Sequence, residues 1–326
     1  MSACPPFKYL LVLPRLRVQN ANAISSPLTH GFPSMTAFLG LSWALERKAR
    51  QAGLDLSFKA VGVVCHDHQE QITEGGFVNA FRLTRNPVDK DGSTAAIVEE
   101  GRIHLELSVV LAVHADLWDT ANRNADVATM LEILAGMRVA GGTVVLPSSS
   151  GVRRLQPWVA DMTGDDDDRR KAFREVCVRL LPGSALVARD ELVDQRLREV
   201  QANRPDATRL DAWLSISRIN WQHDSNANEG KGGWRHDRTG RGWVVPIPVG
   251  YGAIGPVHAA GSVANARDST TPFRFVESLY SVGEWVGPHR LHSPQQLLWY
   301  ADSHPDAGLY RCRNDYRPAD EPVGLL

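Results

Sequence analysis

The sequence predicts an α+β fold with a ferredoxin-like core, on three observations. Residues 1–147 contain the order strand–helix–strand, then a polar, Gly-containing segment, then strand–helix–strand again, which is the split βαβ arrangement. One of these strands, at 102–114, alternates strictly between apolar and polar residues. Residues 148–326 mix helical and strand patterns without an internal repeat. We therefore expect a core at 1–147 with an inserted hairpin or loop, and at 148–326 a mixed elaboration packed on it.

The first strand and helix follow from apolar spacing. Residues 9–18 have the alternation of a strand, and Pro14 within it predicts an edge position or a bulge. Ser34 can cap a helix whose apolar residues follow at helical spacing from Met35, and Gly53 can end it.

The rest of the core is predicted in the same way. Strand patterns occupy 56–66, 75–84 and 102–114. Asp126 is a candidate cap for the next helix, with Gly141 and Gly142 at its end and a short strand at 143–147. RNA-recognition modules share this order, with the first strand in the middle of the sheet. We expect one face of that sheet under the helices and the other free to bind.

The second half is predicted to be mixed. Residues 148–170 are polar and acidic, and Asp165–Asp168 is expected to be a solvated loop or a helix start. Helical patterns follow at 171–181, 190–202 and 207–219, and a polar stretch at 223–233. Strand patterns at 241–252 and 271–290 precede a short helix at 293–302.

Composition restricts the class of protein. The chain has 326 residues, 43% of them hydrophobic, and a net charge of −1, which argues against a simple nucleic-acid coating protein. Six of its 36 basic residues are lysines, which leaves thirty arginines, whose planar guanidinium groups suit phosphate and base recognition. A GC-rich genome would explain the same bias. No apolar run reaches the roughly 18 residues of a membrane span.

The cysteines and histidines give no sign of an enzyme. Cys4, Cys65, Cys177 and Cys312 form no CxxC pair, which favours a reducing compartment, the cytoplasm, and no zinc site. His66, His68 and Glu70 resemble a metal cluster only in outline, and His289 and His292 form a loop pair for which a structural role is favoured over catalysis. No GxSxG, Walker or GxGxxG motif occurs. We expect no catalytic residue, no metal and no cofactor.

Polar loops carry the candidate binding residues. The first carboxylate of the chain is Glu46, so the amide-rich stretch after the first strand contains no acid. Amides can read base edges, while arginines and hydroxyls can hold phosphates or 2′-OH groups. The candidates are Arg15, Arg17, Gln19, Asn20, Asn22, Ser25, Ser26 and His30, then Arg82, Arg85 and Asn86, and then Asn265, Arg267, Arg274 and Arg290. A loop that only fixes its own turns through Asn and Ser side chains is the alternative.

Several long motifs resemble one known family. They are LPRLRVQNANAISSPLTHGFPS, LTRNPVDKDGSTAAIVEEGRIHLELSVVL, GWVVPIPVGY, NARDSTTPFRFVESLYSVGEWVGPHR and LLWY, in this order over nearly the whole chain. Together they resemble the Csy-type second subunit of the type I-F CRISPR surveillance (Cascade) complex. One departure is His30, where a Trp is expected before Gly-Phe-Pro.

The resemblance implies a function. It implies an RNA-recognition-like core with a thumb-like insertion, no catalytic site, and a role in capping the 5′ handle of the guide RNA (crRNA). The implied partners are this handle, the large subunit of the complex, the filament of backbone subunits and the target double-stranded DNA at its entrance. A guide-processing endoribonuclease and a purely structural adaptor remain the alternatives.

Overall fold

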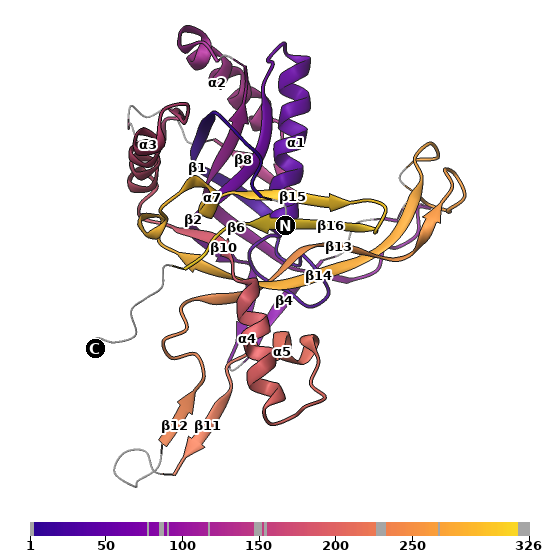
Figure 1. Cartoon of the computed structure of the whole chain (residues 1–326). Coiled ribbons are helices and arrows are strands. Elements are labelled where there is room, and N and C mark those ends of the chain that lie inside the picture. The colour runs from indigo at the N-terminus through magenta and orange to yellow at the C-terminus, as the bar shows by residue number, and fades with distance from the viewer. Residues whose placement is uncertain are drawn as a thin grey trace.

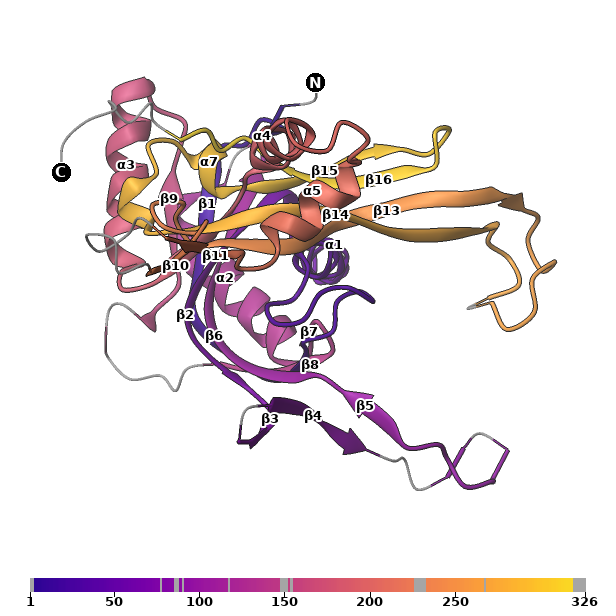
Figure 2. The same ribbon diagram turned by 90° about the horizontal axis from the view of Figure 1, so that it is seen from below.

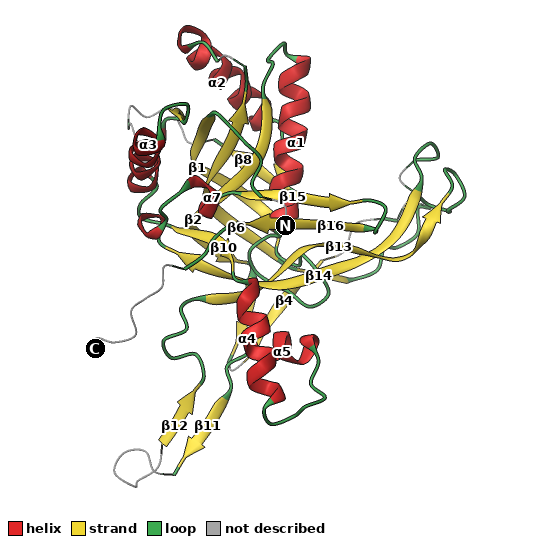
Figure 3. Ribbon diagram, in the orientation of Figure 1, coloured by secondary structure: helices red, strands yellow, loops and turns green. Residues whose placement is uncertain are grey.

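One large antiparallel sheet organises the chain (Figure 1). The computed structural model describes residues 3–76, 78–84, 88–89, 91–116, 118–146, 152, 155–225, 233–266 and 268–318. Within this part of the chain the sheet has eleven strands, in the order β10-β14-β13-β16-β15-β2-β6-β1-β8-β7, and β9 also pairs with β1. Helices pack on it, so the fold is α+β, as predicted (Figure 3).

The first half supplies the centre of this sheet. Its neighbouring strands lie in the order β2-β6-β1-β8, all antiparallel, with β1 in the middle as predicted. The elements of this unit are β1 (Tyr9–Asn22), α1 (Met35–Gln51), β2 (Ser57–Glu70), β6 (Arg102–His114), α2 (Thr120–Ala135), β7 (Arg138–Val139) and β8 (Gly142–Val145).

Local signals explain the helix boundaries. Ser34 caps α1, as predicted, because its hydroxyl accepts the N–H of Thr36. The predicted cap of α2 is wrong. Asp119 caps that helix, whereas Asp126 lies inside it and accepts the indole N–H of Trp118 at 2.7 Å. The predicted end is also wrong, because α2 ends at Ala135 with Gly136 as its C-cap.

The bulge predicted at Pro14 is present, but the strand is not at an edge. The pairing of β1 with β6 shifts between Leu13 and Leu16, and Arg15 adopts a φ of 53° there. On its other side β1 pairs with β9 (Trp158–Asp161) through residues 9–12 and with β8 through residues 17–19. Pro14 lies in the gap between these two pairings, where a central strand can lack an N–H donor.

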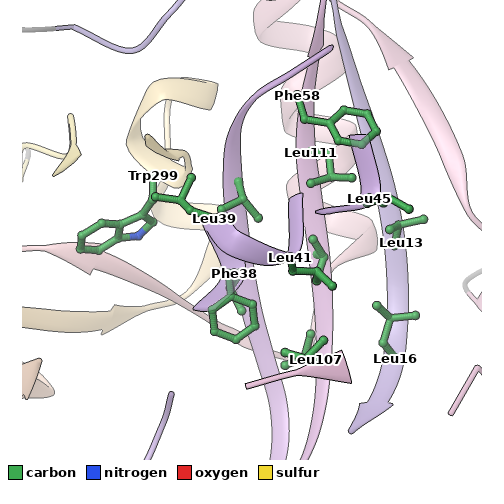
Figure 4. Close-up of a cluster of buried hydrophobic side chains, with 14 of the residues drawn as sticks. Leu13, Leu16, Phe38, Leu39, Leu41, Leu45, Phe58, Leu107, Leu111 and Trp299 are labelled. Carbon is green, nitrogen blue, oxygen red and sulfur yellow. The ribbon is translucent and has the colours of Figure 1, made fainter. Parts of the chain in front are cut away.

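Apolar side chains cover both faces of the sheet. The larger cluster lies between the sheet and α1 and α2, and Figure 4 shows leucines of β1, α1 and β6 meeting in it. On the opposite face, Leu10 and Val12 of β1 pack with Phe173 of α3 (Asp166–Arg179) and with Leu297 and Tyr300. The prediction that this face of the sheet is free to bind is therefore wrong over half the length of β1, because α3 and the C-terminal segment bury it.

The second half continues the sheet from β2. The pairings run from β2 through β10, β14, β13, β16 and β15 and return to β2. These strands are β10 (Ser184–Ala188), β13 (Val244–His258), β14 (Phe273–Val286), β15 (Trp299–His304) and β16 (Leu309–Asn314). The helical elements are α4 (Asp190–Gln201), α5 (Arg209–Ile216), η2 (Pro288–Arg290) and α7 (Pro294–Leu297).

Three hairpin-like segments project from this body. They are β3 (Ile72–Gly75) with β4 (Val78–Thr84) and β5 (Val98–Glu100), β11 (Trp221–Asp224) with β12 (Gly233–His236), and the distal halves of β13 and β14. In Figure 1 the strands β11 and β12 point down, away from the helices α1 and α2, and in Figure 2 the other two segments both extend to the right of the body. Across the described residues, no helix combines the length and the apolar composition that a membrane crossing demands.

Candidate nucleic-acid interface

The distal half of β1 carries an exposed polar strip. Beyond the bulge, Leu16 and Val18 stay in the core while Arg17 and Gln19 point to solvent, because side chains alternate along a strand. The side chain of Arg17 is 69% exposed, and its Nε lies 3.8 Å from Glu106 Oε2. Because Arg17 is so exposed, it can bind a phosphate without losing a buried ion pair.

Arg15 differs from Arg17, although both were predicted as phosphate ligands. Its side chain is only 14% exposed and donates to Glu106 Oε1 at 2.8 Å and to the Pro182 carbonyl at 3.2 Å. Its backbone N–H donates to Ser108 Oγ at 3.1 Å. These contacts hold the bulge against β6, so the geometry gives Arg15 a positioning role.

A hydrogen-bonded cluster lies beside the strip. Asn20 has a φ of 58°, and its N–H donates to His104 Nδ1 at 3.2 Å. The amide of Gln71 donates to Asn20 Oδ1 and lies 2.9 Å from His104 Nε2. Neither Gln71 nor His104 was among the predicted binding residues, although His104 lies on the polar side of the alternating strand 102–114. This polar side of the strand was the sequence signal that could have identified His104.

The loop at 22–34 fixes much of its own shape. Asn22 donates to the Ile24 carbonyl at 2.8 Å and accepts the Ile24 N–H at 3.1 Å. The hydroxyls of Ser26 and Thr29 are 2.6 Å apart, and both residues are buried. Ser25 Oγ accepts the N–H of Ser34. These bonds match the alternative of a self-fixing loop, so a ligand role for Asn22, Ser25 and Ser26 stays a prediction.

His30 joins this loop to the projecting β4. Its ring lies 4.7 Å from that of Phe81 between centroids, at an angle of 55°. Its Nδ1 lies 3.8 Å from Glu70 Oε2. His30 stands where a Trp was expected, and it still packs against an aromatic ring, that of Phe81 in the same chain.

The other predicted residues lie elsewhere. Arg82 is exposed on β4, whereas Arg85, Asn86 and Arg267 are outside the described residues. Asn265 is in the connection between β13 and β14. Arg274, near the same end of β14, donates to the carbonyls of Gly255 at 3.0 Å and Pro305 at 3.1 Å.

Arg290 lines a separate cavity of about 950 Å³. Arg189, Arg238 and Arg241 also line it, together with Glu199 and Glu284. Arg189 pairs with Glu284, and Arg241 lies 3.4 Å from Glu199. The structure therefore does not place Arg290 with the strip on β1, and this cavity is a second basic surface.

The suggested metal cluster is not assembled. His66 has both ring nitrogens engaged, Nδ1 with the Pro182 carbonyl and Nε2 with Ser108 Oγ, each at 2.7 Å. Where the structure describes the chain, no three His, Cys, Asp or Glu side chains are grouped as a metal ion would require. A bulge between Cys65 and Asp67 breaks the alternation that would have aligned His66 and His68.

Comparison with known proteins identifies the family of this chain. Residues 11–312 match the family model of the CRISPR-associated protein Csy2. The chain is also 45% identical over 318 residues to the CRISPR-associated protein Csy2 of Pseudomonas aeruginosa (strain UCBPP-PA14), covering 95% of this chain and 96% of that protein. The chain therefore belongs to the Csy2 family of type I-F CRISPR systems. The family predicted from the motifs is confirmed.

Proposed function

We propose that this protein is a non-catalytic subunit of a type I-F CRISPR surveillance complex that binds the 5′ handle of the crRNA. The exposed strip of Arg17 and Gln19 beside the Asn20 cluster carries the proposal, because it offers one cation and several amides on an accessible sheet face. Single-stranded RNA is read by groups of this kind on splayed bases and their phosphates. A near-neutral chain can therefore bind RNA locally.

The proposal includes a ferredoxin-like core. The strand order β2-β6-β1-β8, with α1 and α2 contributing to one core cluster, supports it. The β3-β4-β5 segment between β2 and β6 would then be the thumb-like insertion. Phe81 of this segment packs on His30 and so holds β4 beside the loop at 22–34.

Pairing with the large subunit completes the proposed role. We propose that the two proteins form the tail of the complex and part of the target-DNA entrance, with the backbone filament extending along the guide. Membership of the Csy2 family supports these partners. The cytoplasmic location stays a prediction.

The test is co-expression of the chain with the large subunit and a guide RNA, followed by quantification of guide RNA per purified complex. Arg17→Glu with Gln19→Ala should weaken handle binding by about tenfold, because a phosphate contact and a base contact are lost. Arg174→Glu, an equal charge change at an exposed position of α3, is the control. Unchanged guide retention in the double variant would overturn the site.

The same preparation separates the alternatives. Specific cleavage of precursor guide by the purified chain, lost on His substitution, would establish an endoribonuclease. An adaptor would retain the large subunit yet give no cross-links from residues 17–30 to the handle.

A further inference from the structure

The cavity of about 950 Å³ that forms the second basic surface has an excess of positive charge. Four arginines and two glutamates line it, and His289 and His292 lie among them. Arg189 pairs with Glu284, whereas the guanidinium of Arg238 makes no hydrogen bond or ion pair with any described residue. A ligand that carries carboxylates would therefore gain charge-assisted hydrogen bonds in this cavity.

A glycine-containing turn holds two of these arginines close together. The N–H of Arg241 donates to the carbonyl of Arg238 at 3.2 Å. Gly240 and Gly242 have φ values of 74° and 70°, a region that a Cβ disfavours. The turn connects β12 to β13, so both arginines stay on the wall of the cavity.

Apolar side chains form another part of the wall. Ile216 of α5 and Val244 of β13 belong to a third buried apolar cluster, and Leu192 of α4 packs against it. All three residues line the cavity. A nucleic-acid backbone has no aliphatic side chain to cover them, whereas a peptide with such side chains would remove this apolar surface from water. The wall therefore suits a peptide that carries both carboxylates and aliphatic groups.

The chain itself supplies such a peptide directly beside the cavity. Tyr316 and Pro318 line the cavity, and the N–H of Tyr316 donates to Asn314 Oδ1 at 3.2 Å, which ties this segment to the end of β16. Residues 319–326, which lie outside the described residues, have the sequence ADEPVGLL, with two acids, one valine, two leucines and no basic residue. Eight extended residues span about 26 Å, which is enough to cross a cavity of this volume.

We propose that residues 319–326 bind in this cavity as an intramolecular ligand, with Asp320 and Glu321 paired with Arg238 and the neighbouring arginines. The valine and leucines of the segment then cover the apolar wall. Because the segment is tethered at Pro318, its effective concentration at the cavity is on the order of millimolar, so weak contacts suffice. The bound segment keeps phosphates off the second basic surface. This inference does not depend on the RNA-binding function proposed above.

The experiment is hydrogen–deuterium exchange of the full chain, read by mass spectrometry on the proteolytic peptide that contains residues 319–326. In the unsubstituted chain we expect these amides to exchange about tenfold more slowly than in a synthetic peptide of the same sequence. Arg238→Glu, and separately Asp320→Asn with Glu321→Gln, should each reduce this protection by about fivefold, because charge pairs are lost. Arg198→Glu is the control, since Arg198 is exposed on α4 and does not line the cavity.

A charge exchange separates loss of the contact from damage to the fold. Glu321→Arg added to Arg238→Glu should restore the protection to within about threefold of the unsubstituted chain, because the pair is formed again with its charges exchanged. Exchange as fast as in the synthetic peptide would overturn the inference, and so would protection that neither set of substitutions reduces. If Arg238→Glu lowers guide retention in the co-expression test while exchange of the segment is unchanged, the cavity binds nucleic acid and the inference is wrong.

Discussion

Arg15 and Arg17 are two residues apart on β1, yet their surroundings differ because a bulge separates them. The positive φ at Arg15 turns its side chain towards Glu106 and the Pro182 carbonyl, whereas Arg17 stays in solvent. The alternation of the strand predicted one polar side for both. It could not distinguish them, because the carbonyl of Pro182 comes from a segment 167 residues away.

The first prediction follows from this difference. Arg15→Ala should lower the free energy of unfolding by about 1–3 kcal/mol, since Glu106 loses its charge-assisted bond in a half-buried place. Arg17→Ala should change it by less than about 0.5 kcal/mol, because the pair is exposed and long. Urea unfolding measures both. Equal losses of stability in the two variants would contradict the positioning role of Arg15.

At the scale of elements, the sequence predicted helix caps and strand faces best where they depend on residues close together in the chain. The cap of α1 at Ser34 is confirmed, and so is the apolar face of β6 from Ile103 to Val113. The predicted half-buried alternation holds only up to Leu107, because residues 108–113 are buried on both faces of the sheet. The predicted start of α2 was wrong because both Asp119 and Asp126 are good capping residues, and in the structure Asp119 caps the helix while Asp126 accepts the indole N–H of Trp118. The closure of the strands back onto β2 could not be predicted, since it joins segments more than a hundred residues apart.

Glycines in a strand and in a helix give the second prediction. A Cβ on Gly62 of β2 would lie 2.6 Å from Leu297 Cγ, and Leu297 of α7 is fully buried and cannot move aside. Gly62→Ala should therefore cost about 1–3 kcal/mol of unfolding free energy. Gly40→Ala is the control, because Gly40 lies in α1 with open space around it, and it should add about 0.5–1 kcal/mol. A neutral Gly62→Ala would show that α7 does not pack closely on β2.

At the scale of the whole molecule, the two buried cores on either side of the sheet each contain a cysteine. Cys312 belongs to the core under α1 and α2, and Cys177 of α3 to the opposite one. The sequence predicted reduced thiols from their spacing, and these four cysteines are free. It could not say which core each thiol enters, because that depends on how α3 and β16 reach the sheet.

These thiols give the third prediction, a loss of stability in alkali. Burial raises the pKa of Cys177 and of Cys312 from 9.0 to about 12. Both thiols stay protonated in the folded chain above pH 9 and ionise in the unfolded chain, so their contribution to stability is complete below pH 9 and is lost as the pH rises towards 12. Urea unfolding at pH 7.5 and 10.5 should show a smaller pH-dependent loss for Cys177→Ala with Cys312→Ala than for the unsubstituted chain. An identical pH-dependent loss in both proteins would mean that the two thiols are not buried in the cores. Rapid reaction of Cys177 with a thiol reagent at pH 8 in the folded protein would likewise show that this thiol of α3 is not buried.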